Sequence, residues 1–77
     1  MILITGSAGY IGSEICKKFE KLKINYIGID NLEYSYKKNI YNTKKFIKTC
    51  ISDNKKVSAV IKKYKITSII HTAAFAY

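Results

Sequence analysis

The amino-acid sequence predicts an α/β fold built on a parallel sheet of about four strands with flanking helices. Two observations indicate this fold. Short apolar runs alternate with longer segments of helical periodicity. The first run, Ile2–Thr5, is apolar on both faces, as central strands of parallel sheets are. With 77 residues, roughly half of an ordinary domain, the chain can form one small core.

The helix that follows the first strand is predicted at residues 12–22, where apolar side chains recur close to every 3.6 residues. These side chains define its expected apolar face: Ile11, Ile15, Phe19 and Leu22. A turn at residues 23–25 leads to a second predicted strand, Tyr26–Asp30, which ends in a carboxylate.

The second half of the chain repeats the alternation. Residues 31–45 are polar, and we expect a loop with one or two weak helical turns. A short third strand is predicted at residues 46–49. Ser52 or Asp53 can then cap a helix, because a side-chain oxygen accepts a free backbone N–H. That helix carries an apolar stripe: Val57, Val60, Ile61 and Tyr64. A fourth strand is predicted at residues 66–71, and the strand order expected for this fold class is 3-2-1-4.

The most informative segment is the glycine loop, residues 5–12, with the sequence TGSAGYIG. It leaves a predicted strand and enters a predicted helix. In this context Gly6 allows a tight turn, Gly9 lets the backbone approach a diphosphate, and Gly12 lets the helix pack closely on the strand. An anion bound there lies against free N–H groups at the positive end of the helix dipole.

Asp30, at the end of the second predicted strand, adds a second signal. Its carboxylate can accept both hydroxyls of an adenosine ribose and would repel a 2′-phosphate, which favours NAD over NADP. The loop and the acid together predict a dinucleotide site in a partial Rossmann fold. The alternative is a purely structural strand-to-helix turn followed by a turn-forming or helix-capping Asp.

Three segments together resemble the extended short-chain dehydrogenase/reductase family. They are the glycine loop with Ser13, the strand end IDNL at residues 29–32, and the segment KITSIIHTAAFAY at residues 65–77. Within that family the chain is most similar to the NAD-dependent epimerases and dehydratases, and among them to the UDP-glucose 4-epimerases. The resemblance covers the whole chain but only about the first quarter of a family enzyme. It therefore implies the N-terminal part of an NAD-binding Rossmann domain at residues 1–77, with the substrate domain absent.

The resemblance also implies which residues hold NAD. The backbone amides of Tyr10 and Ile11 would face the diphosphate, Asp30 would bind the adenine ribose, and Ile51 would flank the adenine ring. The glycines of the loop and further residues on both sides of the crevice complete the expected cofactor-binding set: Gly6, Gly9, Gly12, Asn31, Leu32, Ser35, Thr72, Ala73 and Ala74.

Two positions depart from the family pattern. Family members usually carry Asp immediately before the position of Ile51, where it bonds the adenine amino group. Here that position is Cys50, a weak hydrogen-bonding group, so we expect looser adenine recognition. Many epimerases carry Lys at the position of Ala76, and its replacement points to a subgroup of the family.

In the family, NAD oxidises the C4 hydroxyl of a nucleotide sugar, and hydride returns to the opposite face of a 4-keto intermediate. A Tyr-x-x-x-Lys pair supplies the acid and base. In this chain only Tyr41 and Lys45 have that spacing, in the loop after the second strand and far from the expected nicotinamide position. We therefore assign no catalytic residue and expect no epimerase activity from residues 1–77 alone.

Other functions remain as alternatives. Nucleotide-sugar dehydratases, decarboxylases and reductases share this region of the family. A truncated product without a function of its own is another possibility. In a complete enzyme the substrate would be a UDP-sugar. The open, apolar edge expected at the fourth strand leaves room for a complementing C-terminal polypeptide or a homodimer.

The charge of the chain raises an alternative of another class, a small basic nucleic-acid-binding protein. Fourteen basic residues against five acidic ones give a formal net charge of +9. All of the basic residues are Lys, whereas Arg dominates base and phosphate recognition. The Lys pairs are also spread along the chain, so we expect solvated faces and no nucleic-acid partner.

The remaining signals predict neither a metal site nor membrane insertion. No apolar run approaches the roughly 20 residues that cross a bilayer, and the first residues lack the basic region of a secretory signal. Cys16 and Cys50 are too few for a zinc site, so we expect free thiols in a cytoplasmic protein. His71 has no sequence partner and is expected to be structural.

Overall fold

The computed structural model describes residues 1–33 and 35–72. Strands and helices alternate, with two short 3₁₀ helices, η1 and η2, in the connection that follows the second strand. The elements in chain order are β1 Ile2–Thr5, α1 Tyr10–Leu22, β2 Tyr26–Asp30, η1 Lys37–Asn39, η2 Thr43–Lys45, β3 Phe46–Lys48, α2 Asn54–Lys63 and β4 Ser68–His71.

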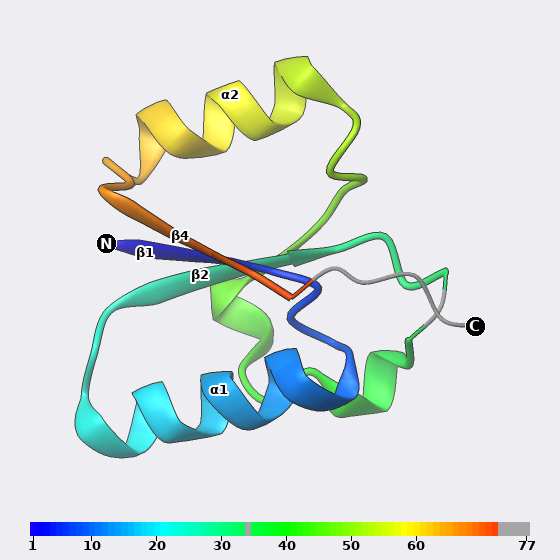
Figure 1. Ribbon diagram of the computed structural model, residues 1–77, viewed down its shortest axis with the longest axis vertical. Coiled ribbons are helices and arrows are strands. Elements are labelled where there is room, and N and C mark those ends of the chain that lie inside the picture. Colours follow the sequence, from blue (N-terminus) through cyan, green and yellow to red (C-terminus); the bar gives the residue numbers. More distant parts are fainter. Residues whose placement is uncertain (34, 73–77) are drawn as a thin grey trace.

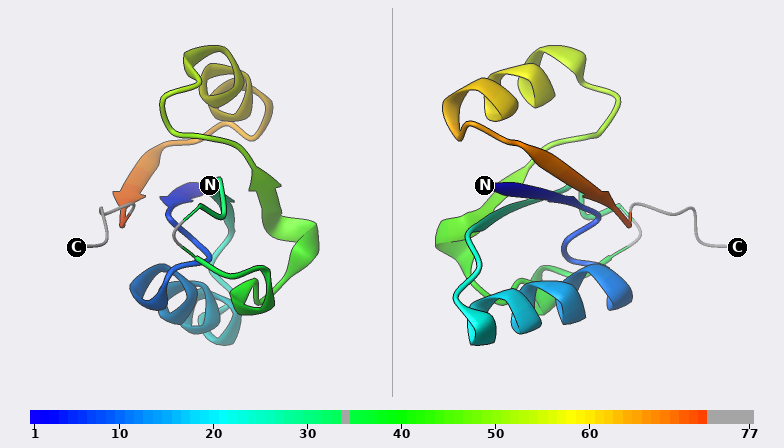
Figure 2. Two further views of the ribbon diagram at one scale, coloured as in Figure 1. Left: turned by 90° about the vertical axis from the view of Figure 1, so that its right-hand side faces the viewer. Right: turned by 60° about the vertical axis from the view of Figure 1, so that its left-hand side comes forward.

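The four strands form one parallel sheet in the order β3-β2-β1-β4, as the sequence predicts. The two helices lie on opposite faces of this sheet, which gives three layers (Figure 1; Figure 2). In this strand order β1 is central, because it lies between β2 and β4. The carboxyl ends of β1, β2 and β4 meet at one edge of the sheet, where ligands bind in open α/β folds.

The core on the α2 side consists of four buried residues, Leu3, Ile27, Ile29 and Val60. Burial of each such aliphatic side chain stabilises the fold by about 1.5–3 kcal/mol. The predicted stripe of the second helix is confirmed, because Val57, Ile61 and Tyr64 also pack against this cluster. The cap is Asp53, whose side chain accepts a hydrogen bond from the backbone N–H of Lys56 at 3.2 Å.

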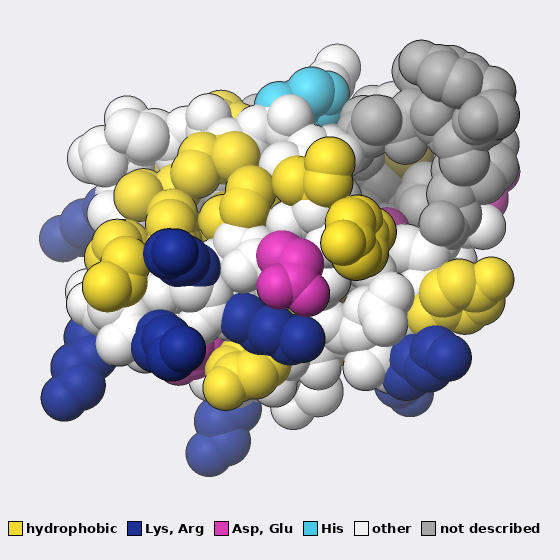
Figure 3. Space-filling view, turned by 60° about the horizontal axis from the view of Figure 1, so that its bottom comes forward, with side chains coloured by type: hydrophobic (Ala, Val, Ile, Leu, Met, Phe, Trp, Pro, Cys, Tyr) yellow, Lys and Arg dark blue, Asp and Glu magenta, His cyan; other side chains and the backbone are white. Residues whose placement is uncertain are grey.

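The core on the α1 side differs from the expected helix face. Ile15 and Phe19 pack on the buried cluster, but Ile11 and Leu22 are 63% and 59% exposed. The helix instead buries three small residues: Gly12, Ser13 and Cys16. At Gly12 the helix approaches the glycine loop so closely that only a residue without a side chain fits there. Figure 3 shows apolar side chains gathered on this side of the molecule, beside Lys side chains.

Three element boundaries also differ from the sequence prediction. α1 begins at Tyr10 rather than Gly12, because Gly9 already serves as its N-cap. The third strand ends at Lys48, one residue short of the prediction. The fourth begins at Ser68 because the N–H of Ile66 is used in closing α2, where it donates to the carbonyl of Ile61 at 3.0 Å. The two weak helical turns expected in residues 31–45 are confirmed as η1 and η2.

Candidate functional site

The glycine loop connects the end of β1 to the start of α1 through one left-handed residue. Gly6 has φ 68°, a conformation that favours glycine. The N–H of Gly9 donates to the Gly6 carbonyl at 3.0 Å, which closes the turn. Gly9 itself is extended, with φ −77° and ψ 174°, and the helix starts at the next residue.

Gly12 sets how closely the helix approaches the loop. A Cβ atom there would lie 2.1 Å from the Gly6 carbonyl oxygen and 2.8 Å from the Thr72 hydroxyl. No side chain fits in that space, so the spacing of the loop requires glycine at this position. The first turn of α1 is thereby held over the carboxyl end of β1.

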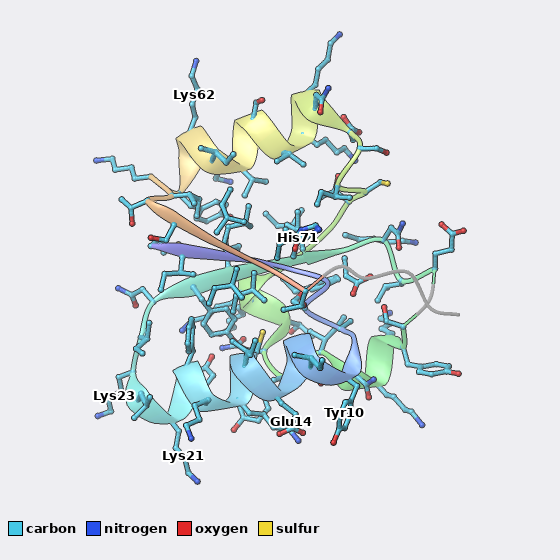
Figure 4. All side chains as sticks on the ribbon, in the orientation of Figure 1. Tyr10, Glu14, Lys21, Lys23, Lys62 and His71 are labelled. Atoms are coloured by element: carbon cyan, nitrogen blue, oxygen red, sulfur yellow. The ribbon has the colours of Figure 1, made fainter. Side chains whose placement is uncertain are left out.

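The amino end of α1 is suited to an anion. The N–H groups of Tyr10, Ile11 and Gly12 precede the first intrahelical hydrogen bond, which the N–H of Ser13 makes to Gly9 at 2.9 Å. Neither a side-chain cap nor an acidic residue compensates this end. The Tyr10 side chain is 82% exposed and points away from the sheet (Figure 4), which leaves its backbone rather than its ring to face a ligand at the loop. Backbone donors and the helix dipole together favour a bound phosphate.

Asp30 is hydrogen-bonded directly to the glycine loop. One carboxylate oxygen accepts the N–H of Ala8 at 3.1 Å, and the other accepts the N–H of Leu32 at 2.8 Å. Leu32 has φ 63°, which turns its amide back onto the acid. A carboxylate offers about four lone-pair positions, so about two remain for further donors such as a pair of hydroxyls.

A pocket lies beside Asp30 at the carboxyl ends of the strands. Four of the predicted site residues line it together with residues of β1, β2 and the segment after β3: Thr5, Gly6, Ile29, Asp30, Asn31, Thr49 and Ile51. The structure therefore brings Gly6, Asp30, Asn31 and Ile51 around one opening. Thr49 is buried, and among the described residues its hydroxyl has no hydrogen-bond partner.

Thr72 follows β4 and lies against the glycine loop from the other side. Its hydroxyl donates to the carbonyls of Thr5 and Gly6, and its N–H donates to the carbonyl of Thr5 at 3.1 Å. The Thr5 hydroxyl lies 2.8 Å from Nδ1 of His71, which supports a structural role for this histidine. The other predicted residues of this segment, Ala73 and Ala74, lie outside the described residues.

The remaining predicted residues have different surroundings. Leu32 contributes the backbone N–H to Asp30, and its side chain does not line the pocket. Ser35 does not line the pocket either, and within residues 1–33 and 35–72 its buried hydroxyl has no partner.

Cys50, which precedes Ile51, is half-buried at the rim of this region. Its Sγ lies 3.0 Å from the Ser52 hydroxyl and 3.8 Å from the Asn31 amide nitrogen. Hydrogen bonds from Ser52, first from the hydroxyl and then from the backbone, lower the pKa of the thiol, with a smaller contribution from Asn31. Burial and the charge of Glu33 oppose this shift. The thiol is only a weak hydrogen-bond acceptor.

Sequence reasoning missed the contribution of Asn39. Its side-chain amide donates to the carbonyl of Ala8 at 3.2 Å, so the end of η1 is tied to the glycine loop. No periodicity or motif marks this residue, because the contact depends on how residues 31–45 fold back over α1. Thr5 and Thr49 were also missed. Thr5 ends β1 and Thr49 directly follows β3, and no sequence motif distinguishes either from an ordinary strand residue.

The pair with catalytic spacing, Tyr41 and Lys45, belongs to another part of the molecule. Lys45 forms an ion pair with Glu20 at 3.4 Å and lies over the ring of Tyr26 at 5.0 Å. These contacts join η2 to the middle of the sheet and to α1. They give Lys45 a structural role.

The described residues contain no group of three or more metal-binding side chains. No helix in residues 1–33 or 35–72 is long and apolar enough to span a membrane. Lys21 on α1, Lys23 just after it and Lys62 on α2 extend outward (Figure 4), as expected of solvated Lys faces.

Comparisons with known proteins give a consistent result. A family model described as the NAD dependent epimerase/dehydratase family matches residues 2–77. The dTDP-D-glucose 4,6-dehydratase of Dictyostelium discoideum is 39% identical over 88 aligned positions, which cover 99% of this chain and 19% of that protein. The UDP-glucose 4-epimerase of Lactobacillus helveticus is 31% identical, with 97% and 23% covered.

Solved structures agree with this result. The crystal structure of UDP-glucose 4-epimerase from Brucella ovis in complex with NAD superposes with a TM-score of 0.89 at 29% identity, covering 99% of this chain and 23% of that one. The chain therefore spans about a fifth to a quarter of the length of the proteins it matches.

Proposed function

This chain belongs to the NAD dependent epimerase/dehydratase family, and we propose that it binds the ADP half of NAD at the carboxyl ends of β1 and β2. The observation that carries the proposal is the hydrogen bond between Asp30 and the N–H of Ala8. Through this bond the ribose-binding acid and the phosphate-binding loop form one connected unit. The carboxylate is thereby held beside the loop that leads into the uncapped amino end of α1.

The diphosphate would lie against the amino end of α1. The N–H groups of Tyr10 and Ile11 are available there, and Gly6 and Gly9 leave the backbone uncovered by side chains. Thr72 holds the carbonyls of Thr5 and Gly6 from behind, so these acceptors are occupied rather than directed at an anion. The loop thereby presents donors to the diphosphate and keeps two acceptors away from it.

The adenosine would lie in the pocket beside Asp30. The free lone pairs of Asp30 can accept the two ribose hydroxyls, and Asn31 and Ile51, which line the same pocket, would flank the adenine. A 2′-phosphate would bring negative charge against the carboxylate, so NAD is preferred to NADP. Cys50 offers the adenine amino group a weaker acceptor than a carboxylate, so we expect looser adenine recognition.

For the complete protein we propose a nucleotide-sugar 4-epimerase of the UDP-glucose/UDP-galactose type. NAD, when bound, would accept a hydride from C4 of the sugar and later return it to the same carbon. The residues of this chain bind and orient the ADP end and keep the cofactor fixed at the sheet edge. The second candidate is a nucleotide-sugar 4,6-dehydratase, favoured by the relative in Dictyostelium discoideum, since both activities share this part of the family.

Calorimetric titration of NAD, ADP and NADP into the chain tests the proposal. We expect NAD and ADP to bind and NADP to bind at least about 10-fold more weakly. Asp30→Asn should weaken NAD by about 10- to 100-fold, because hydrogen bonds to a charged group contribute about 1.5–3 kcal/mol. Asp53→Asn is the matched control, since it removes the same charge from the cap of α2 and Asn caps helices well. Equal affinity of Asp30→Asn and the unmodified chain, or no preference for NAD over NADP, would refute the proposal.

A further inference from the structure

Asn39 makes a contact that the proposed cofactor site does not yet explain. It is the last residue of η1 and is half-buried, and its side-chain amide donates to the backbone carbonyl of Ala8 at 3.2 Å. Within the described residues, this is the side-chain hydrogen bond that links the connection between β2 and β3 to the glycine loop.

The contact acts on one particular peptide group. The Ala8 carbonyl and the Gly9 N–H belong to the same planar peptide, so fixing one orients the other. Asn39 holds the carbonyl, while the Gly9 N–H donates to Gly6 at 3.0 Å. This peptide is therefore clamped at both ends, immediately before the helix begins at Tyr10.

The preceding peptide of the loop is held in a similar way. The N–H of Ala8 donates to Asp30 at 3.1 Å, and the Ala8 side chain is fully buried. Ala8 is thus fixed by Asp30 on its amide side and by Asn39 on its carbonyl side. If the carbonyl were released and turned outward, its oxygen would face a bound anion and the loop would no longer present donors only.

We propose that Asn39 is a positioning residue for the diphosphate of the cofactor. It touches no ligand atom itself. It keeps the Ala8 carbonyl turned away from the anion and thereby holds the first amides of α1 in the orientation that binds phosphate. Such preorganisation lowers the cost of ordering the loop on binding. The inference rests on the proposed function, because it requires that the glycine loop binds a diphosphate.

Asn42 provides a matched control in the same connection. Its side-chain amide also donates across to another element, but to the Glu20 carboxylate in α1 at 2.8 Å. Loss of either amide removes one contact that anchors residues 31–45. Only loss of the Asn39 amide releases the glycine loop.

The experiment titrates ADP, inorganic pyrophosphate and adenosine into the unmodified chain and into Asn39→Ala, Asn39→Asp and Asn42→Ala, observed by amide NMR. One hydrogen bond corresponds to roughly 2- to 10-fold in affinity. Asn39→Ala should weaken ADP and pyrophosphate by that factor and leave adenosine unchanged. Asn39→Asp should weaken them further, because a carboxylate cannot donate to the carbonyl. Asn42→Ala should leave all three affinities within twofold.

The outcomes separate the inference from the function on which it rests. If the unmodified chain binds neither ADP nor pyrophosphate, the proposed function fails. If it binds both and Asn39→Ala binds them equally well, or loses adenosine to the same degree, the positioning role is wrong and the proposed function stands. Should Asn39→Ala lose its folded spectrum, Asn39→Asp takes its place, because its carboxylate has nearly the shape of the amide but cannot donate to the Ala8 carbonyl. A weaker pyrophosphate affinity with unchanged adenosine affinity supports the inference in that variant, and unchanged pyrophosphate affinity overturns it.

Discussion

At the scale of single residues, Gly9 and Gly12 differ sharply in the space around them. A Cβ at Gly12 would collide with the Gly6 carbonyl oxygen at 2.1 Å, whereas a Cβ at Gly9 would lie 3.3 Å from the same atom. Gly9 also has an ordinary φ of −77°. Close packing therefore requires glycine at position 12, whereas at Gly9 the packing leaves room for a small side chain and the proposed ligand access is the reason for glycine.

We predict that Gly12→Ala lowers the free energy of unfolding by about 3 kcal/mol, since the collision involves backbone that cannot move without disturbing β1. Gly9→Ala should stay within about 1 kcal/mol of the unmodified chain, because Ala adopts this φ and also restricts the unfolded chain. Urea unfolding of both variants measures the difference. Equal stability of the two variants would show that the close approach of α1 is not required.

The two thiols are predicted to react very differently. The pKa of Cys50 is lowered by its hydrogen bonds to Ser52, whereas burial, aided by the charge of Glu20, raises the pKa of Cys16 to about 11. At pH 8 a larger fraction of Cys50 is therefore thiolate, and iodoacetamide should alkylate it at least about 10-fold faster than Cys16. Ser52→Ala should slow the reaction at Cys50. Peptide mass spectrometry after timed alkylation measures both rates, and similar rates at the two thiols would contradict this account.

Motif spacing identifies some site residues from sequence and misses others for a physical reason. Gly6 and Asp30 are predictable because a strand-to-helix turn and a strand end impose residue types at fixed places. Asn39 and Thr49 are not predictable from motif spacing. The hydrogen bond of Asn39 depends on the path of a polar connection, and Thr49 lines the pocket because it is buried after β3. The substitution at Cys50 is visible in the sequence, but its hydrogen bond to Ser52 is not.

At the scale of elements, Glu20 joins three parts of the fold. Its carboxylate in α1 accepts hydrogen bonds from Asn42 at 2.8 Å and from the Tyr26 hydroxyl of β2 at 3.2 Å, and it pairs with Lys45 of η2. The hydrogen bond from Asn42 is the main cause of the lowered pKa of Glu20, and the charge of Lys45 adds to it. This cluster holds the connection between β2 and β3 against α1.

The lowered pKa of Glu20 predicts a specific pH dependence of stability. Because the folded pKa lies below the unfolded one, the unfolded chain binds protons first as the pH falls. The contribution of Glu20 is therefore fully present at neutral pH and is lost as the pH falls through the folded pKa. Urea unfolding between pH 7 and pH 3 should show the difference between the unmodified chain and Glu20→Gln shrinking toward acid.

Glu14→Gln is the control for this prediction, because Glu14 makes only an exposed ion pair with Lys17 at 3.6 Å. It should have little effect at any pH. A stability difference for Glu20→Gln that stays constant from pH 7 to pH 3 would mean that the carboxylate charge does not hold this cluster together.

The helices also show what an apolar pattern can and cannot predict about packing. The stripe of α2 was predictable because large aliphatic side chains make its contact with the sheet. The face of α1 was predicted only in part: Ile15 and Phe19 pack on the core, but Gly12 and Cys16 are buried where Ile11 and Leu22 were expected. Close packing by small residues leaves no signal in a hydrophobic pattern, and only the glycine spacing indicates it.

At the scale of the whole molecule, the strand order follows from the alternation of elements, and the structure confirms it. Central strands are apolar on both faces, and parallel connections place the first strand between the second and the fourth. The exposed apolar surface is less readily predicted. Ile69 in β4 is 53% exposed, and the outer edge of β4 has no neighbour within the described sheet. The matched proteins are four to five times longer, so further segments are available in them to cover such an edge.

The glycine loop and Asp30 are proposed to act as one ADP-binding unit, and amide NMR during titration of NAD into the ¹⁵N-labelled chain tests this most directly. We predict that the amides of residues 9–12 and 30–32 shift together and saturate at one affinity, while those of α2 stay in place. Unchanged amides at Gly9 and Asp30 in a well-folded sample would contradict the account. So would shifts confined to the Lys-rich surface of α2 that vanish when salt is added.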